Sequence, residues 1–128
     1  DIEQVMERIV TVPASADTTV LLTKATVNSE DSAVDIQDTK YIRVTNLDST
    51  NSVTLSLQVD GNESGTAANE SCSILLEAGR TFIMGTPHDA IDVSDTSASI
   101  LTSLKDLESI LVDSFTNAVK LEVFVAGA

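Results

Sequence analysis

The sequence has no Trp, one Cys, one His and one Tyr among its 128 residues, and aromatic residues make up only 3% of it. A single cysteine, Cys72, excludes a disulfide framework within the chain and any zinc site built from cysteines. A single histidine, His88, means that any His-based triad or metal site must be built around this residue. The scarcity of aromatic rings also weighs against a carbohydrate-binding surface.

Basic residues are scarce as well, since 7 bases face 20 acids and give a formal charge of −13. Such a chain repels polyphosphates and anionic lipid surfaces, so we expect no nucleic-acid partner and no membrane partner. There is no run of about 18 apolar residues, and the start of the sequence lacks the basic residues of a signal peptide. Residues 1–64 carry a net charge of −7 and residues 65–128 carry −6. The charge therefore belongs to the whole folded surface and not to a tail.

Alternation of apolar and polar residues predicts β-strands. Residues 53–59 alternate without exception, residues 41–45 alternate too, and residues 119–125 do so apart from Phe124, which falls on the polar face. Six further runs are rich in Val, Ile, Thr and Leu: residues 8–12, 18–27, 33–37, 72–76, 81–84 and 109–115. We therefore expect eight or nine strands.

The segments between these runs are mostly short and polar, which favours antiparallel strands, because parallel strands need long crossovers. Between residues 97 and 111, apolar residues recur at helical spacing, which predicts a short helix near residues 99–107 with Ser97 or Ser99 as its N-cap. A second brief helix is expected in the first eight residues. The predicted fold is a single all-β domain, residues 1–128, forming an antiparallel β-sandwich of jelly-roll or immunoglobulin-like type.

One loop has a partial calcium-binding pattern. Asp60, Asn62 and Ser64 occupy positions 1, 3 and 5 of an EF-hand-like loop, with Gly65 at position 6. Position 12 is Ser71, where the pattern needs a bidentate Glu, and strands are expected on both sides. A polar strand connection explains the same residues. We therefore expect no bound metal and no cofactor, with this loop as the calcium candidate.

The sequence offers little for catalysis. His88 and Asp89 are neighbours, but adjacent residues on a turn rarely point at each other, and no Gly-x-Ser-x-Gly elbow supplies a nucleophile. No glycine-rich cradle for a nucleotide is present either. We expect His88 to be an exposed turn residue and the protein to have no enzymatic activity.

The stretch Leu-Leu-Glu-Ala-Gly-Arg-Thr-Phe-Ile-Met at residues 75–84, with the later strands at 109–112 and 119–125, resembles the C-terminal half of small virion proteins of tailed bacteriophages. The strands at 41–46 and 53–59 are similar to the middle of those proteins. The resemblance covers residues 40–128 and implies a jelly-roll-like sandwich in a virion, working as a homo-oligomer with a major capsid protein or another virion component. It carries over no binding residues, and the long segment 85–99 departs from the family pattern.

Three hypotheses follow, in order of preference. The first is a non-enzymatic capsid-associated or decoration protein, the second a glycan- or calcium-binding adhesion module, and the third a small hydrolase built on His88. The first must overcome repulsion between copies of charge −13. Its contacts should therefore bury apolar loops, recruit cations, or set bases against carboxylates. The candidate bases are Arg8, Lys24, Arg43 and Arg80.

Overall fold

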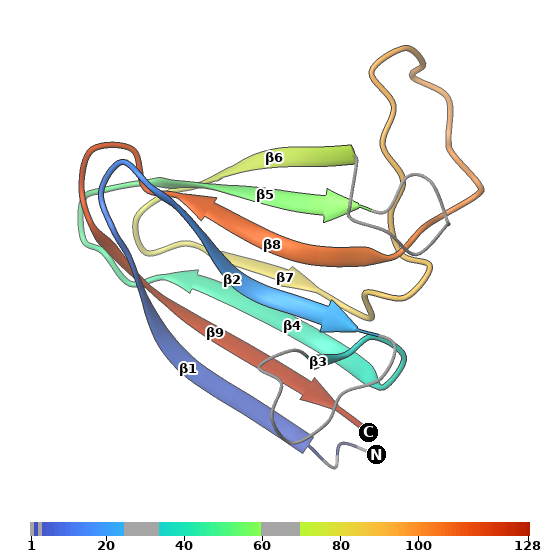
Figure 1. Ribbon diagram of the computed structural model, residues 1–128, viewed down its shortest axis with the longest axis horizontal. Coiled ribbons are helices and arrows are strands. Elements are labelled where there is room, and N and C mark those ends of the chain that lie inside the picture. The colour runs from blue at the N-terminus through green and yellow to red at the C-terminus, as the bar shows by residue number, and fades with distance from the viewer. Residues whose placement is uncertain (1, 3, 25–33, 60–69) are drawn as a thin grey trace.

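The computed structural model describes residues 2, 4–24, 34–59 and 70–128, and these residues form nine β-strands (Figure 1). The strands are β1 (Gln4–Val12), β2 (Asp17–Lys24), β3 (Val34–Asp35), β4 (Thr39–Asn46), β5 (Val53–Val59), β6 (Glu70–Leu76), β7 (Thr81–Met84), β8 (Leu107–Asp113) and β9 (Val119–Gly127).

The strands form two sheets with the orders β1-β9-β4-β7 and β3-β2-β8-β5-β6. All pairings are antiparallel except that of the two-residue strand β3 with β2, which is parallel. Apart from β2 to β3 and the hairpin β5 to β6, each strand is followed in the chain by a strand of the opposite sheet. This alternation is the strand order of a jelly roll. The predicted all-β sandwich of eight or nine strands is confirmed.

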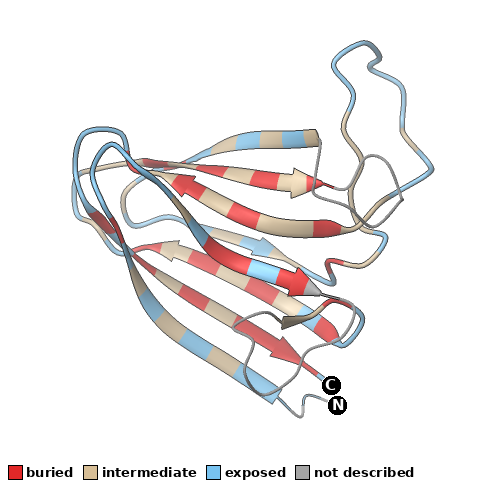
Figure 2. Ribbon diagram, in the orientation of Figure 1, coloured by how far each residue is buried: buried red, intermediate tan, exposed pale blue. Residues whose placement is uncertain are grey.

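The core lies between the two sheets and follows from the alternation of residues along each strand (Figure 2). Strand β5 buries its four odd-numbered residues, and β9 does the same from Val119 to Val125. Burying one such Val or Leu side chain stabilises the fold by about 1.5–3 kcal/mol. The fully buried large side chains include Val12, Val20, Leu21, Ile42, Val44, Val53, Leu55, Val59, Leu107, Ile110, Leu121 and Val112.

Both predicted helices are wrong, since no helix occurs among the described residues and hence none that could cross a membrane. Residues 4–12 form β1, and residues 99–106 form an irregular segment followed by β8. Near residue 100 the helical spacing is outweighed by Ser and Thr side chains that hydrogen-bond to nearby backbone. For example, the Ser97 hydroxyl accepts a hydrogen bond from the Ser99 N–H at 3.1 Å. Leu107 is fully buried as the first residue of β8.

Two turns in contact with each other close one end of the sandwich. The turn between β1 and β2 lies against the turn between β8 and β9, where the Ser15 N–H donates to the Phe115 carbonyl at 2.7 Å. The Ser114 hydroxyl, which is buried, donates to the Pro13 carbonyl at 2.9 Å. Because β8 begins at the opposite end, the long segment between β7 and β8 emerges far from these turns (Figure 1).

Candidate functional site

Residues 85–106, here called the arm, leave the sandwich between β7 and β8 and project beyond the strand ends in Figure 1. Backbone hydrogen bonds fasten its base. Leu107 N–H donates to the Pro87 carbonyl at 2.8 Å, and Ile91 and Lys105 exchange two hydrogen bonds of 3.1 and 2.8 Å. The arm is therefore held at its base by two hydrogen-bonded segments, residues 87–92 and 105–107, here called the neck. It is not a freely hinged loop.

An ion pair adds to this neck. Lys105 Nζ lies 3.4 Å from Asp92 Oδ1, and the two side chains are only 16% and 13% exposed. Because screening by water is weaker for charges with this little exposure, the pair contributes more than one on the open surface. The neck thus joins its two chain segments by backbone and side chain together.

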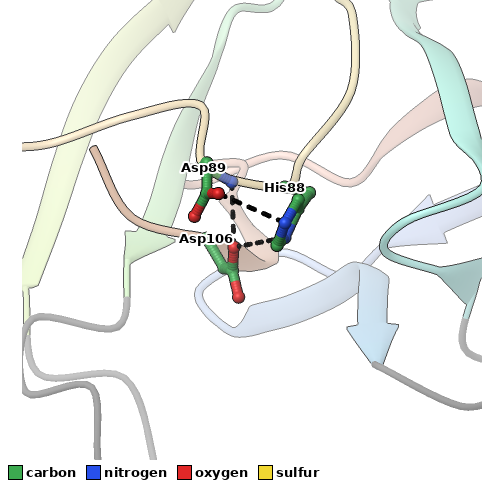
Figure 3. A group of neighbouring side chains, drawn as sticks. All are labelled: His88, Asp89 and Asp106. Carbon is green, nitrogen blue, oxygen red and sulfur yellow. Dashed lines mark hydrogen bonds and ion pairs between the residues drawn. The ribbon is translucent and has the colours of Figure 1, made fainter. Parts of the chain in front are cut away.

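His88 lies at the base of this neck, beside two carboxylates (Figure 3). Its Nε2 is 3.2 Å from Asp89 Oδ2, and its Nδ1 is 3.0 Å from Asp106 Oδ1. Asp106 Oδ1 also accepts the Asp89 backbone N–H at 2.9 Å. The expectation that neighbours on this turn do not point at each other is wrong here. Asp89 has a left-handed φ of 47°, which is uncommon for a residue other than glycine. This backbone conformation accompanies the approach of its carboxylate to the neighbouring His88 ring.

One atom from each of His88, Asp89 and Asp106 lies within 4.8 Å of the others, so the three are the described residues that could hold a metal ion. The two carboxylates, however, contact different ring nitrogens, whereas a metal ion takes one nitrogen of an imidazole. The contacts do not form a hydrogen-bonded triad either, since the buried His88 Nδ1 has no hydrogen-bond partner among the described residues. The calcium candidates Asp60, Asn62 and Ser64 lie outside the described residues.

Asp106 was not predicted from the sequence as a neighbour of His88. It stands 18 positions after His88, and only the pairing of the two neck segments brings it to the imidazole. Leu107, directly after Asp106, is the sequence signal that could have indicated it. This apolar residue starts the buried strand β8 and so fixes where the chain returns to the sandwich.

The arm beyond the neck ends in an uncharged tip that exposes aliphatic side chains. Residues 96–104 contain no charged side chain, although 21% of the whole chain is charged. Ile100 is 91% exposed and Leu104 is 43% exposed. The tip therefore offers aliphatic side chains to solvent from a fixed base.

A second apolar surface covers the outer side of the β1-β9-β4-β7 sheet, here called the outer face. Strand register arranges its side chains in four rows. The rows are Val5, Ala126 and Tyr41; then Glu7, Phe124, Arg43 and Ile83; then Ile9, Glu122, Thr45 and Thr81; then Thr11 and Lys120. Three aliphatic side chains in these rows, Val5, Ile9 and Ile83, are each about 60% exposed.

The centre of the outer face is held by contacts among four side chains. Arg43 donates to Glu122 Oε1 at 3.0 Å and lies over the Phe124 ring, while Tyr41 meets the edge of that ring at a centroid distance of 5.9 Å. Desolvation would lower the pKa of Arg43, but the hydrogen bonds to Glu122 and Tyr41 outweigh it and raise that pKa. Arg43, one of the bases expected to meet carboxylates, thus does so within its own chain.

No protein-family model and no curated protein matches this sequence. Among solved structures, the chain is similar to a Bacillus endospore appendage protein, described as a member of a family of disulfide-linked pili. The two share 13% identity with a TM-score of 0.43, over 95% of this chain and 84% of the other. At this identity and TM-score, the likeness assigns neither a function nor a partner to this chain.

Proposed function

We propose that this protein is a non-enzymatic structural component of a virion, of the capsid-associated or decoration type of tailed bacteriophages. It acts by packing against copies of itself and against a capsid protein. The observation that carries the proposal is the arm, whose uncharged tip exposes aliphatic side chains and whose base is fastened by the neck. The virion context rests on the resemblance of residues 40–128.

The arm suits contact with a neighbouring subunit for two physical reasons. Burying an isoleucine that is 91% exposed, as Ile100 is, contributes about 1.5–3 kcal/mol to an association. The absence of charge from residues 96–104 also means that this tip approaches a copy of charge −13 without adding a like charge to the contact. The neck keeps the entropy cost of docking low, because its segments are already paired.

The test compares two variants that make the same chemical change at different places. Ile100→Asp changes the arm tip, and Leu75→Asp changes an aliphatic side chain that is 62% exposed on β6. We expect both variants to melt like the wild type. Only Ile100→Asp should lose co-sedimentation with virus particles and the large assemblies seen by native mass measurement.

Two results would contradict the proposal. One is a wild-type chain that neither self-associates nor co-sediments with particles. The other is an Ile100→Asp variant that behaves like Leu75→Asp in both measurements, since the arm would then make no contact.

A further inference from the structure

The outer face differs from the corresponding side of the other sheet in its charge. Its four rows hold two acids, Glu7 and Glu122, and two bases, Arg43 and Lys120, so their charges cancel. On the other sheet, Asp17 of β2 pairs directly with Asp113 of β8, which places two like charges side by side. In a chain of charge −13, the outer face is thus a locally neutral surface.

We propose that a second copy of this chain packs on the outer face, related to the first by a two-fold axis that runs along β9. The inference deepens the proposed function by naming one partner and its symmetry, and it shares with that function only the premise of self-association. A two-fold contact uses the same surface on both copies, so this surface must be complementary to itself. A face with equal numbers of acids and bases brings no net charge to such a contact, whereas a face of paired aspartates does. On the axis, Glu122 and Lys120 lie over their own copies, and each Glu122 is paired with Arg43 of its own chain.

The row pattern specifies which side chains meet. In the sheet order, β1 and β4 lie on either side of β9. A two-fold axis along β9 therefore sets β1 of each copy over β4 of the other. Glu7 and Arg43 belong to the same row, so Glu7 of each copy lies over Arg43 of the other. In the next row towards the C-terminal end of β9, Val5 lies over Tyr41.

The central side chains need little rearrangement for this contact. Arg43 is already held by Glu122 and Phe124, and its side chain is 32% exposed. Its guanidinium has donors left after the hydrogen bonds to Glu122 and Tyr41 and can take a carboxylate of a second copy. A preformed contact residue loses less conformational entropy on binding.

The size of the face limits the strength of the contact. Four strands about 4.8 Å apart and about eight residues long at 3.3 Å per residue give a projected face on the order of 500 Å². Two such faces approach the low end of specific interfaces, about 1,200 Å² in total. The dimer should therefore dissociate on dilution, and added salt should weaken it because one part of the contact is ionic.

Sedimentation equilibrium of the full chain tests the contact. Glu7→Arg and Arg43→Glu should each weaken dimerisation about tenfold, and the double variant should dimerise more tightly than either single variant, because the charges are exchanged. Ile9→Ser, which changes a 65% exposed side chain and leaves the core intact, should weaken the dimer as well. The control, Asp17→Arg, makes a matching change of charge on the other sheet and should leave the dimer unchanged.

Three results would overturn the inference: a wild-type chain that stays monomeric, Glu7→Arg or Ile9→Ser dimers as tight as the wild type, or a double variant no tighter than the singles. The proposed function is decided separately by particle binding and by Ile100→Asp. A monomeric wild type that still co-sediments with particles through the arm removes this dimer and leaves the proposed function in place.

Discussion

Arg43 on β4 lies over the ring of Phe124 on β9, with its guanidinium carbon 4.7 Å from the ring centroid. Phe124 interrupts the alternation of residues 119–125 by falling on the polar face, and the structure gives the reason. The ring is covered by Arg43 and met at its edge by Tyr41, so a large apolar side chain on the outer side of the sheet is partly shielded from water.

The first prediction concerns this contact. A double-mutant cycle with Arg43→Met and Phe124→Leu should give a coupling free energy of about 0.5–1 kcal/mol, because the methionine keeps much of the aliphatic stem and removes the cation. Urea unfolding at low protein concentration measures it. Replacing Arg43→Met by Lys120→Met, on the same face but four residues from Phe124, should give a coupling near zero. Equal coupling free energies in both cycles would show that the Phe124 ring interacts with positive charge on this face in general and not with Arg43 in particular.

The second prediction concerns Asn46, which is fully buried at the end of β4. Its Nδ2 donates to the carbonyls of Asn51 at 2.9 Å and Leu76 at 3.2 Å, and its Oδ1 accepts the Asp48 N–H at 2.9 Å. Asn46→Ala leaves three backbone groups without these partners and should lower the free energy of unfolding by about 2–3 kcal/mol. Chemical denaturation measures the change.

The control for Asn46 is Asn117→Ala, because Asn117 is exposed and its side chain makes only a 3.4 Å contact with Thr116. This variant should unfold within about 0.5 kcal/mol of the wild type. If the two variants unfold at the same denaturant concentration, the three hydrogen bonds of Asn46 stabilise the fold no more than hydrogen bonds to water would.

Much of the sheet structure could be predicted from the sequence, because one-sided burial imposes a period of two on each strand. Every predicted run contains or overlaps an observed strand, and residues 53–59 match β5 at both ends. The helix near residues 99–107 could not be rejected in this way. Helical spacing records only which residues are apolar, whereas Ile100 is 91% exposed and packs on no surface of the part of the chain that the structure describes.

The His88 cluster and the outer face depend on strand order, which local patterns do not contain. Asp106 reaches His88 because the neck pairs Ile91 with Lys105, and Arg43 reaches Glu122 because β4 lies beside β9. Residues 46–51 are one of the short polar segments between the predicted strands. Asn46 is buried there because it also donates to the carbonyl of Leu76 at the end of β6, a contact that only the folded chain provides.

The third prediction concerns acid pH and Asp48. Backbone hydrogen bonds from Thr50 at 2.9 Å and Asn51 at 2.6 Å lower the pKa of Asp48 below its ordinary value of 3.8. A group whose pKa is lowered by folding stabilises the native state above its unfolded pKa, and this contribution is lost as pH falls through the folded pKa. Wild-type protein should therefore lose stability below about pH 4 partly through Asp48.

Asp48→Asn isolates that contribution, since asparagine keeps an oxygen acceptor but does not titrate in this range, and the other carboxylates titrate in both proteins. The wild type should be more stable than the variant at neutral pH, and the difference should shrink as pH falls below 3.8. Urea unfolding at a series of pH values measures it. A difference that stays constant across the series would mean that the charge of Asp48 does not strengthen these hydrogen bonds.

The fourth prediction concerns Gly127, the last residue of β9, which pairs with Gln4 of β1 and Thr39 of β4. A Cβ at this position would lie 2.6 Å from the Asp38 carbonyl oxygen, which already accepts the Ala128 N–H at 2.9 Å. Because the obstacle is backbone, Gly127→Ala must displace strand β4 or break that hydrogen bond, at a cost of about 1–3 kcal/mol.

The matched control for Gly127 is Gly85→Ala, where the nearest atom to a new Cβ, the Lys40 carbonyl oxygen, is 3.9 Å away and nothing need move. Thermal unfolding should show a lower melting temperature for Gly127→Ala and little change for Gly85→Ala. The cause can be separated from a general loss of glycine flexibility, because only the first change also exposes the Ala128 amide to hydrogen exchange. If Gly127→Ala has the melting temperature of the wild type and its Ala128 amide stays protected, the start of β4 shifts to accommodate the new Cβ without loss of stability.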